Sequence, residues 1–239
     1  MLTNVRLPKA CLPSLLRRRP SPSQRVLYGG QGLSVGQATV ADLLRPCEKR
    51  YAIFYDIALI IGGSLLIGLC AQLAILLPFS PVPVTGQTFA VLMIGALLGA
   101  RRGCLSVLAY IIEGAGGLPV FALGRGGFAV LLGPTGGYLV GFVAAAYITG
   151  LLAERGWDRR AGTTVLAMIF GNAAIYAFGL LWLCCLMGVR WSVLIAGLYP
   201  FVVGDLLKIV LAAVLLPTGW KLIVARRSSL VVRTTNHAP

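Results

Sequence analysis

A charged pair interrupts an apolar stretch near the end of the sequence. Asp205 and Lys208 lie three residues apart in YPFVVGDLLKIVLAAVLL, so a helix would place both side chains on one face. An ionisable group inside such a stretch costs free energy unless it is paired or faces a polar cavity. The pair is therefore predicted to bracket a polar ligand. The alternative is an internal ion pair that only fixes helix packing.

Polar residues also gather in two segments between apolar runs. The first, residues 78–88, reads PFSPVPVTGQT and includes Thr85 and Gln87. The second, residues 113–128, reads EGAGGLPVFALGRGGF and includes Arg125. Prolines stiffen the first and glycines let the second bend, and irregular backbone near membrane depth is tolerated where it lines a cavity. Both segments are predicted to form lids over a site, with ordinary connectors as the alternative.

The residue types give no support for catalysis. The sequence has no G-x-x-x-x-G-K-[ST] motif, no H-E-x-x-H motif, no Ser/His/Asp set and no paired acidic motif in its loops. Its six cysteines show no C-x-x-C spacing, and the single histidine, His237, lies in the tail. We therefore expect a protein that is not an enzyme and that uses no cofactor, metal or disulfide.

The elements that must position the pair belong to a membrane protein. Apolar residues make up 58% of the chain and charged residues 12%, with a mean hydropathy of +0.87. A helix needs about 20 residues to cross a hydrocarbon core of about 30 Å. Four runs are long enough, namely Ile57–Leu77, Pro134–Leu152, Thr163–Val189 and Trp191–Leu216, the last of which contains the charged pair.

Two shorter stretches lie between the first two of these runs. Val84–Ala100 has 17 residues, whereas Gly103–Ile112 has only 10 before Glu113 interrupts it. Length alone leaves the second open between a short tilted helix and a re-entrant segment. Counting both, the sequence predicts an all-α integral membrane protein with six transmembrane helices.

Small residues recur at four-residue spacing within the predicted spans. Gly95 and Gly99 form one such pair, and Gly133, Gly137 and Gly141 form a series. This spacing lets helix backbones approach closely. We expect it to serve packing within the bundle more readily than a partner interface.

The net charge of +14 is distributed unevenly along the chain. With six spans, twelve basic residues fall on one side of the membrane, and only Arg125 and Arg190 fall on the other. Because basic residues concentrate on the cytoplasmic side, both termini are predicted to face the cytoplasm or its equivalent in an organelle. No basic cluster is interleaved with aromatic residues, so no nucleic-acid partner is expected.

Residues 1–50 form a basic leader with nine Lys or Arg against two acids. Its composition resembles an organellar transit segment, and a disordered bacterial extension or a mis-assigned start codon fits it equally well. We predict a leader over 1–50, a membrane domain over 51–221 and a basic cytoplasmic tail over 222–239. The protein would lie in the plasma (inner) membrane of a bacterium, or in a plastid-type organellar membrane if the leader is a transit peptide.

Four blocks occur in the order and spacing of a known family. They are LPFSPVPVTGQTFAVLMIGALLGARRG, GGLPVF, GRGGFAVLLGPTGGYLVGF and GDLLK. From about Tyr51 to about Lys221, the chain resembles the BioY family, the biotin-binding S components of energy-coupling-factor (ECF) transporters. The resemblance implies a six-helix S-component bundle with cytoplasmic termini, which binds biotin from the outer side. It also implies, as partners, a transmembrane coupling subunit and two ATPase subunits, which fits the missing nucleotide motif.

The resemblance suggests roles for the charged residues. Biotin carries a urea with two N–H donors and one carbonyl acceptor, an apolar sulfur ring, and an anionic valerate tail. Asp205 is expected to accept from the urea, while Lys208 donates to a ligand oxygen or holds Asp205 in place. Arg125 is the candidate for the carboxylate, because a guanidinium matches it with two hydrogen bonds.

Four polar residues complete the expected site. Thr85 and Gln87 would cap the ligand from the first loop, and Asn172 and Tyr176, one turn apart on the fifth span, would add a hydrogen bond and a stacking face. Two alternatives stay open. The chain could be an S component for another vitamin, or a membrane assembly protein with no substrate, in which Asp205 and Lys208 only hold helices together.

Overall fold

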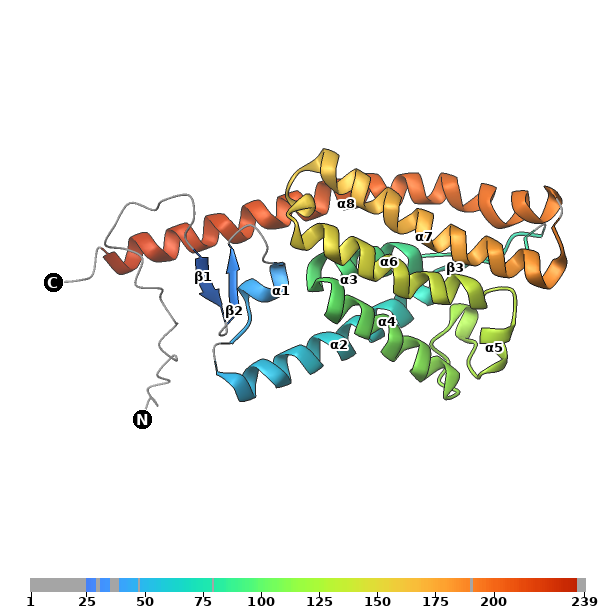
Figure 1. The fold of residues 1–239 in the computed structure, drawn as a ribbon, viewed down its shortest axis with the longest axis horizontal. Helices are drawn as coiled ribbons and strands as arrows, with labels where there is room; N and C mark the ends of the chain where they lie inside the picture. Colours follow the sequence, from blue (N-terminus) through green and yellow to red (C-terminus); the bar gives the residue numbers. More distant parts are fainter. Residues whose placement is uncertain are drawn as a thin grey trace.

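The computed structural model describes residues 25–28, 31–34, 39–46, 48–78, 80–189 and 191–235. Most of the predicted leader and Arg190 lie outside the described residues. Within the described part, six helices of twelve residues or more form an elongated bundle (Figure 1). They are α2 (Lys49–Gln72), α3 (Gln87–Leu98), α4 (Ala100–Ala115), α6 (Gly136–Glu154), α7 (Ala161–Met187) and α8 (Trp191–Thr235).

Short elements connect and flank these helices. Two antiparallel pairs of strands occur, β1 (Arg25–Tyr28) with β2 (Gln31–Ser34), and β3 (Ala74–Ile75) with β4 (Val84–Thr85). The remaining short elements are helical turns, namely α1 (Val40–Leu43), η2 (Ala122–Gly124), α5 (Ala129–Leu132) and η3 (Trp157–Arg159). Strand β4 lies in the first of the two segments that the sequence analysis predicted to be lids, and η2 lies in the second.

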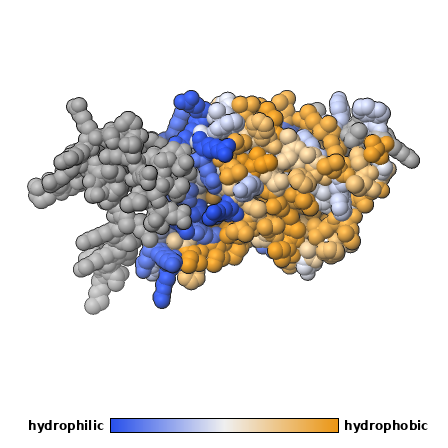
Figure 2. Space-filling model, viewed as in Figure 1, coloured by the Kyte–Doolittle hydropathy of each residue, from blue (hydrophilic) through white to orange (hydrophobic). Residues whose placement is uncertain are grey.

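Among the described residues, four helices are long and apolar enough to cross a membrane, and each overlaps one of the four long runs of the sequence. They are α2, α6, α7 and the Gly204–Ile223 part of α8, while α3 is a shorter apolar helix. An apolar surface covers the bundle next to a hydrophilic belt at one end (Figure 2). The class predicted from the sequence, an all-α integral membrane bundle, is confirmed.

The number of crossings and the side on which the termini lie stay predictions. Helix α2 begins and α8 ends at the same end of the bundle (Figure 1). This arrangement fits an even number of crossings. It also brings the basic residues near the start of α2 and near the end of α8 to one side.

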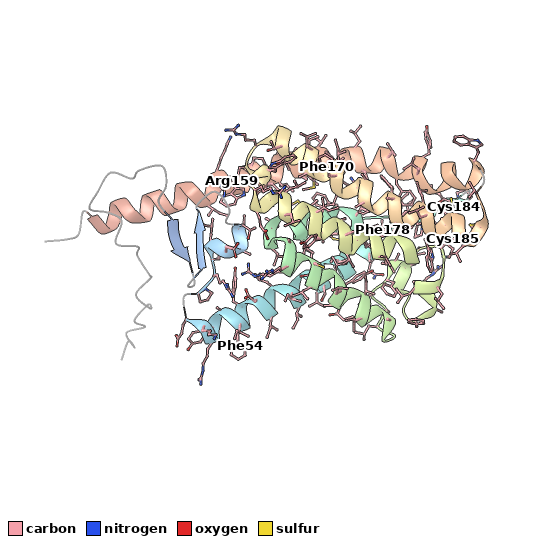
Figure 3. All side chains as sticks on the ribbon, viewed as in Figure 1. Phe54, Arg159, Phe170, Phe178, Cys184 and Cys185 are labelled. Atoms are coloured by element: carbon pink, nitrogen blue, oxygen red, sulfur yellow. The ribbon has the colours of Figure 1, made fainter. Side chains whose placement is uncertain are left out.

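Helix α7 illustrates how one span crosses the whole bundle. Arg159, just before it, lies near one end, while Cys184 and Cys185 lie near the other (Figure 3). Phe170 and Phe178 remain 51% and 44% exposed along its length. Exposed aromatic and aliphatic side chains can face lipid, because lipid tails are as apolar as these side chains.

The ambiguous stretch around Glu113 is a helix. Helix α4 starts at Ala100 and runs through Glu113 to Ala115, giving 16 residues. The Glu113 carboxylate is not isolated, because Ser64 on α2 donates a hydrogen bond to its Oε1 at 2.8 Å. A paired carboxylate can stay within the helix, so the acidic residue does not end it.

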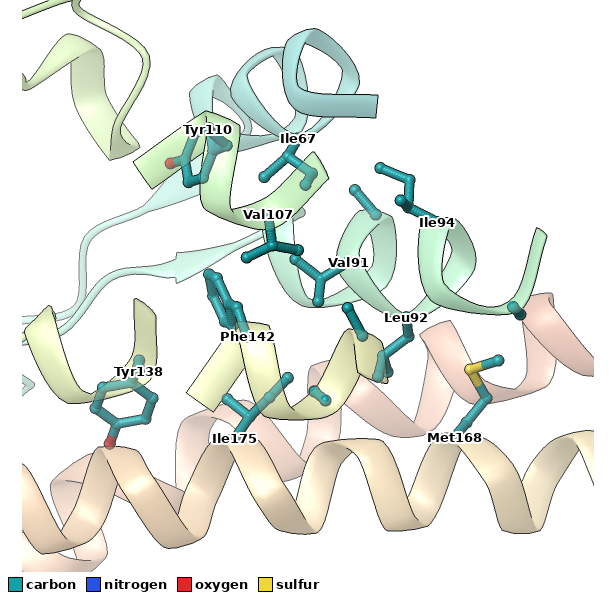
Figure 4. Packing of buried hydrophobic residues seen from close by; sticks show 14 of the residues in the cluster. Ile67, Val91, Leu92, Ile94, Val107, Tyr110, Tyr138, Phe142, Met168 and Ile175 are labelled. Atoms are coloured by element: carbon teal, nitrogen blue, oxygen red, sulfur yellow. The ribbon is translucent and has the colours of Figure 1, made fainter. Parts of the chain in front are cut away.

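Glycines set the distances between α3, α4, α6 and α7. A Cβ on Gly95 would lie 2.6 Å from the carbonyl oxygen of Ala146 on α6. On Gly141 it would lie 3.0 Å from the Cα of Ile175 on α7. These contacts lie within one chain, as the spacing predicted. Between the helices pack buried side chains such as Ile67, which is fully buried (Figure 4).

Residues that precede α2 in the chain also contact the helical bundle. Thr39 is fully buried, and the carboxylate of Asp42 forms an ion pair with Arg102 of α4 at 2.8 Å. Arg102 also pairs with Asp56 of α2 at 2.9 Å, and Arg45 pairs with the same carboxylate at 2.6 Å. Ion pairs therefore join residues 39–46, which the sequence analysis assigned to the leader, to α2 and α4. We call these ion pairs the Arg102 ion network.

Candidate functional site

A pocket lies at the end of the bundle away from the Arg102 ion network. It holds about 650 Å³ of empty space, a volume that includes open solvent at its mouth. Its walls come from the first loop and the start of α3, from the second loop, and from α6, α7 and α8. Segments far apart in the sequence therefore converge on one cavity.

Aromatic and aliphatic side chains form most of the wall. Phe121 comes from the second loop, Tyr138 and Phe142 from α6, Ile175 from α7 and Phe201 from α8. The rings of Tyr138 and Phe201 are stacked, with centroids 5.9 Å apart and planes 27° apart. Such walls suit an apolar ring system, while a few polar groups fix its orientation.

The first loop is a packed part of this wall. The β3–β4 pairing places Thr85 opposite Ala74, and the Gly86 amide donates to the Leu73 carbonyl at 2.9 Å. A Cβ on Gly86 would lie 2.9 Å from the Cys70 carbonyl oxygen, so a glycine is needed for this approach. The chain then turns into α3 with Thr85, Gln87 and Thr88 buried and all three lining the pocket.

Lys208 is fully bonded to protein groups. Its ammonium donates to the Thr85 carbonyl at 2.9 Å, to Thr88 Oγ1 at 2.7 Å and to Asp205 Oδ1 at 2.9 Å. An ammonium has three N–H groups, and these three bonds use all of them. Of the two roles expected for Lys208, the geometry favours holding Asp205 in place over donating to a ligand.

Asp205 stands directly behind the pocket wall. Only 3% of it is exposed, and it is outside the lining itself. Its Oδ1 accepts from Thr88 at 3.2 Å, and its Oδ2 accepts from the Tyr176 hydroxyl. Because Thr88 and Tyr176 both line the pocket, the carboxylate reaches the cavity through these two hydroxyls.

Arg125 lines the pocket from the second loop. It is exposed, and its guanidinium forms no ion pair or hydrogen bond with any residue that the structure describes. Its backbone is fixed nonetheless, since the Phe121 amide donates to the Arg125 carbonyl at 2.9 Å. Among the described residues, the guanidinium has no partner that would compete with an anion for its hydrogen bonds.

The side chain of Gln72, at the end of α2, fastens the second loop. Its Oε1 accepts from the Gly124 amide at 3.0 Å, and its Nε2 donates to the Phe121 carbonyl at 3.3 Å. Leu123, between them, has a left-handed backbone with φ of 64°, which is rare for leucine. The sequence analysis did not select Gln72; its only signal was a polar residue at the end of an apolar run.

The predicted site residues fall into three groups. Thr85, Gln87, Arg125 and Tyr176 line the pocket, whereas Asp205 and Lys208 stand behind its wall. Asn172 is buried one turn from Tyr176 but is outside the lining, and its Oδ1 has no hydrogen-bond partner among the described residues.

The sequence analysis did not assign the aromatic wall or Thr88 a role in the site. Thr88 was quoted only as part of the first loop. Its position one residue after Gln87 was the available signal for it.

Comparisons with known proteins agree with this architecture. A model of the BioY family matches residues 44–225. The biotin transporter BioY of Rhizobium etli is 40% identical over 160 residues, covering 63% of this chain and 86% of that protein. The biotin transporter BioY of Thermotoga maritima is 41% identical over 143 residues, covering 58% of this chain and 81% of that protein.

A solved structure shows the same arrangement of helices. The crystal structure of the S-component for biotin from an ECF-type ABC transporter is similar with a TM-score of 0.63 and 27% identity. The match covers 73% of this chain and 95% of that one. The family model matches 182 of the 239 residues (44 to 225), and the structural match covers 95% of the solved chain. The two bacterial relatives are 40% and 41% identical to this chain. The chain is a member of the BioY family.

Proposed function

We propose that this protein binds biotin in the pocket and mediates biotin uptake across a membrane. The observation that carries the proposal is the distribution of chemistry around one cavity. Its wall combines hydroxyl and amide groups, aromatic side chains, and a guanidinium with no partner among the described residues. The relatives named biotin transporters, and the solved S-component for biotin, support the same ligand.

The urea of biotin fits the polar part of the wall. Its two N–H groups need acceptors, and the Tyr176 and Thr88 oxygens are there with the Asp205 carboxylate directly behind them. Its carbonyl needs a donor, which the Gln87 amide can supply. Lys208 neutralises Asp205 and ties it to the first loop, so the acceptors are held before the ligand arrives.

The other end of the ligand is assigned to Arg125. The valerate carboxylate would take two hydrogen bonds from the guanidinium, and the sulfur ring would lie among the aromatic side chains between the two ends. Asn172 is proposed to add a hydrogen bond one turn from Tyr176, because its Oδ1 is buried without a described partner. In each assignment, a hydrogen-bond donor on one partner faces an acceptor on the other.

Transport is proposed to need partners rather than catalysis by this chain. As an S component, the protein would capture biotin on the outer side, and a coupling membrane subunit with ATPase subunits would supply the energy. The membrane is the inner membrane of a bacterium, or a plastid-type membrane if residues 1–50 prove to be a transit peptide. We propose no enzymatic role and no cofactor other than biotin as the transported ligand.

Uptake of radiolabelled biotin tests the proposal. Bacteria that neither make nor import biotin would express the chain alone or together with ECF coupling and ATPase subunits. Label should accumulate in at least one arrangement, excess thiamine should not compete, and Asp205→Asn at an equal membrane level should accumulate little. Competition by thiamine would indicate another vitamin. No accumulation in either arrangement, with the protein present in the membrane, would favour an assembly role.

A further inference from the structure

Tyr110 touches both loops of the pocket without lining the pocket. It lies in α4 and is fully buried. Its hydroxyl accepts a hydrogen bond from the Gln87 side chain, which belongs to the first loop and the start of α3. Its ring packs edge to face against Phe121 of the second loop, with centroids 5.5 Å apart and an angle of 83°. Gln87 and Phe121 are themselves part of the wall.

The hydroxyl contact anchors the Gln87 amide. While Nε2 donates to Tyr110, Oε1 accepts from Thr85 Oγ1 at 3.2 Å. The Thr85 carbonyl in turn accepts from Lys208 at 2.9 Å. A continuous set of hydrogen bonds therefore runs from Tyr110 to the ion pair on α8.

The ring contact fixes the second loop. Gly114 lies one helical turn from Tyr110, and a Cβ there would come within 2.6 Å of the Phe121 ring. Gly114 therefore leaves the space that Phe121 occupies, and Tyr110 forms the edge of that space. The Phe121 amide donates to the Arg125 carbonyl, so the position of the ring carries over to Arg125.

We propose that Tyr110 is a positioning residue that holds the two loops in one fixed relation across the pocket. The hydroxyl aligns Gln87 for the polar end of the ligand, and the ring aligns Arg125, through Phe121, for the anionic end. This inference rests on the proposed function, because it assumes that the pocket takes a ligand with those two ends. It adds a residue that a ligand in the pocket would not touch.

The two contacts can be separated by substitution. Tyr110→Phe removes the hydroxyl and keeps the ring, so biotin affinity should fall about tenfold through faster dissociation. The ratio of affinities for biotin and biotin methyl ester should stay at the wild-type value, because the Phe121 contact remains. Phe121→Leu should do the reverse, weakening biotin more than the ester. Tyr147→Phe, at a half-exposed tyrosine on α6, is the matched control and should change nothing.

A double-mutant cycle with Gln87→Leu distinguishes positioning from a general loss of stability. In the Gln87→Leu background, Tyr110→Phe should cause no further loss of biotin affinity, because the group that the hydroxyl aligns is gone. An equal tenfold loss in both backgrounds, or no loss in either, would overturn the inference.

Two further outcomes are decisive. If Tyr110→Phe does not fold, Phe121→Leu still tests the ring contact, and an unchanged ratio of biotin to ester affinity contradicts it. A wild-type protein that binds no biotin would overturn the proposed function and this inference with it. Wild-type binding with an unaffected Tyr110→Phe variant would overturn this inference alone.

Discussion

At the scale of single residues, the Asp205–Lys208 pair shows what keeps a charge inside a membrane helix. The side chain of Asp205 is 4% exposed and that of Lys208 is 18% exposed. Each charge is matched by the other, and hydroxyl and carbonyl groups take up the remaining hydrogen bonds. A pair of this kind gains little stability over apolar packing, which indicates that its value lies in the polar wall that it supports.

The two members of the pair should differ in how much stability their loss costs. Lys208→Met leaves the more deeply buried Asp205 without its counter-charge and should cost about 3 kcal/mol, seen as a lower midpoint of thermal unfolding in detergent. Asp205→Asn should cost less, because Lys208 keeps its bonds to Thr85 and Thr88. The double variant should regain part of the loss. An equal midpoint for all three variants would contradict this account of the pair.

Arg125 should matter only for the charged end of the ligand. Arg125→Ala should weaken biotin binding by about tenfold to a hundredfold, because charge-assisted hydrogen bonds are lost. Binding of biotin methyl ester should be nearly unchanged, and equilibrium dialysis of both ligands measures the contrast. Arg155→Ala, at an exposed arginine just after α6, serves as the control. Equal losses for acid and ester would place the carboxylate elsewhere.

The residues of the site were predictable to different degrees. Asp205 and Lys208 were evident, because charges in an apolar run require an explanation. Tyr110 was not, because a tyrosine near the end of a membrane helix is ordinary and its role depends on two loops that meet only in the folded chain. Asn172 shared helical spacing with Tyr176, yet only Tyr176 lines the pocket.

At the scale of elements, the close contacts of α3, α4 and α6 depend on glycines, which have no side chain to keep the helices apart. A Cβ on Gly150 of α6 would lie 2.5 Å from the Cα of Ala100, where α4 begins. In lipid, packing contacts of this kind replace the hydrophobic effect as the force between helices. The position of α4, and with it Tyr110 behind the pocket, follows from this contact.

A pair of glycine substitutions tests the packing. Gly150→Ala should lower the midpoint of thermal unfolding, with a cost of about 1–3 kcal/mol from overpacking. Gly62→Ala adds the same methyl group to α2 where nothing lies within 4 Å, and alanine favours a helix over glycine. It should leave the midpoint unchanged or raise it slightly. A larger loss in Gly62→Ala than in Gly150→Ala would contradict the arrangement of these helices.

The elements themselves were predictable where the apolar runs were long. The four long runs became helices over most of their length, because apolar residues dominate them and the two charges in the last run are paired. The boundaries of α3 and α4 were not predictable, because the β3–β4 pairing delays the start of α3 and the Ser64 contact lets α4 continue through Glu113. Both effects come from neighbours that are remote in the sequence.

At the scale of the whole molecule, the ion pairs around Arg102 join residues before α2 to the helical bundle. Asp42 and Arg45 join α2 and α4 at the end of the bundle opposite the pocket, and Thr39 is buried there. Any removal of a leader that leaves the bundle intact should therefore stop before Thr39. Sequence composition could not show this, because it averaged these residues with the basic segment that precedes them.

Two deletions test this boundary. Removing residues 1–38 should leave the thermal midpoint unchanged, since the ion network and the Thr39–Asp42 hydrogen bonds remain. Removing residues 1–48 should lower it, because Arg102 and Asp56 each lose one partner. Scanning fluorimetry of both proteins in the same detergent measures the difference. Equal midpoints for the two deletions would indicate that the folded membrane domain begins at about residue 50.

The measurement that tests the central claim most directly is equilibrium binding of radiolabelled biotin to the purified protein. Wild type and Asp205→Asn would be compared in detergent, with both proteins monodisperse and thermally folded. We predict that wild type binds biotin, that excess thiamine does not displace it, and that Asp205→Asn loses binding. A monodisperse wild-type protein that binds no biotin, or an Asp205→Asn variant that binds it as wild type does, would contradict the account.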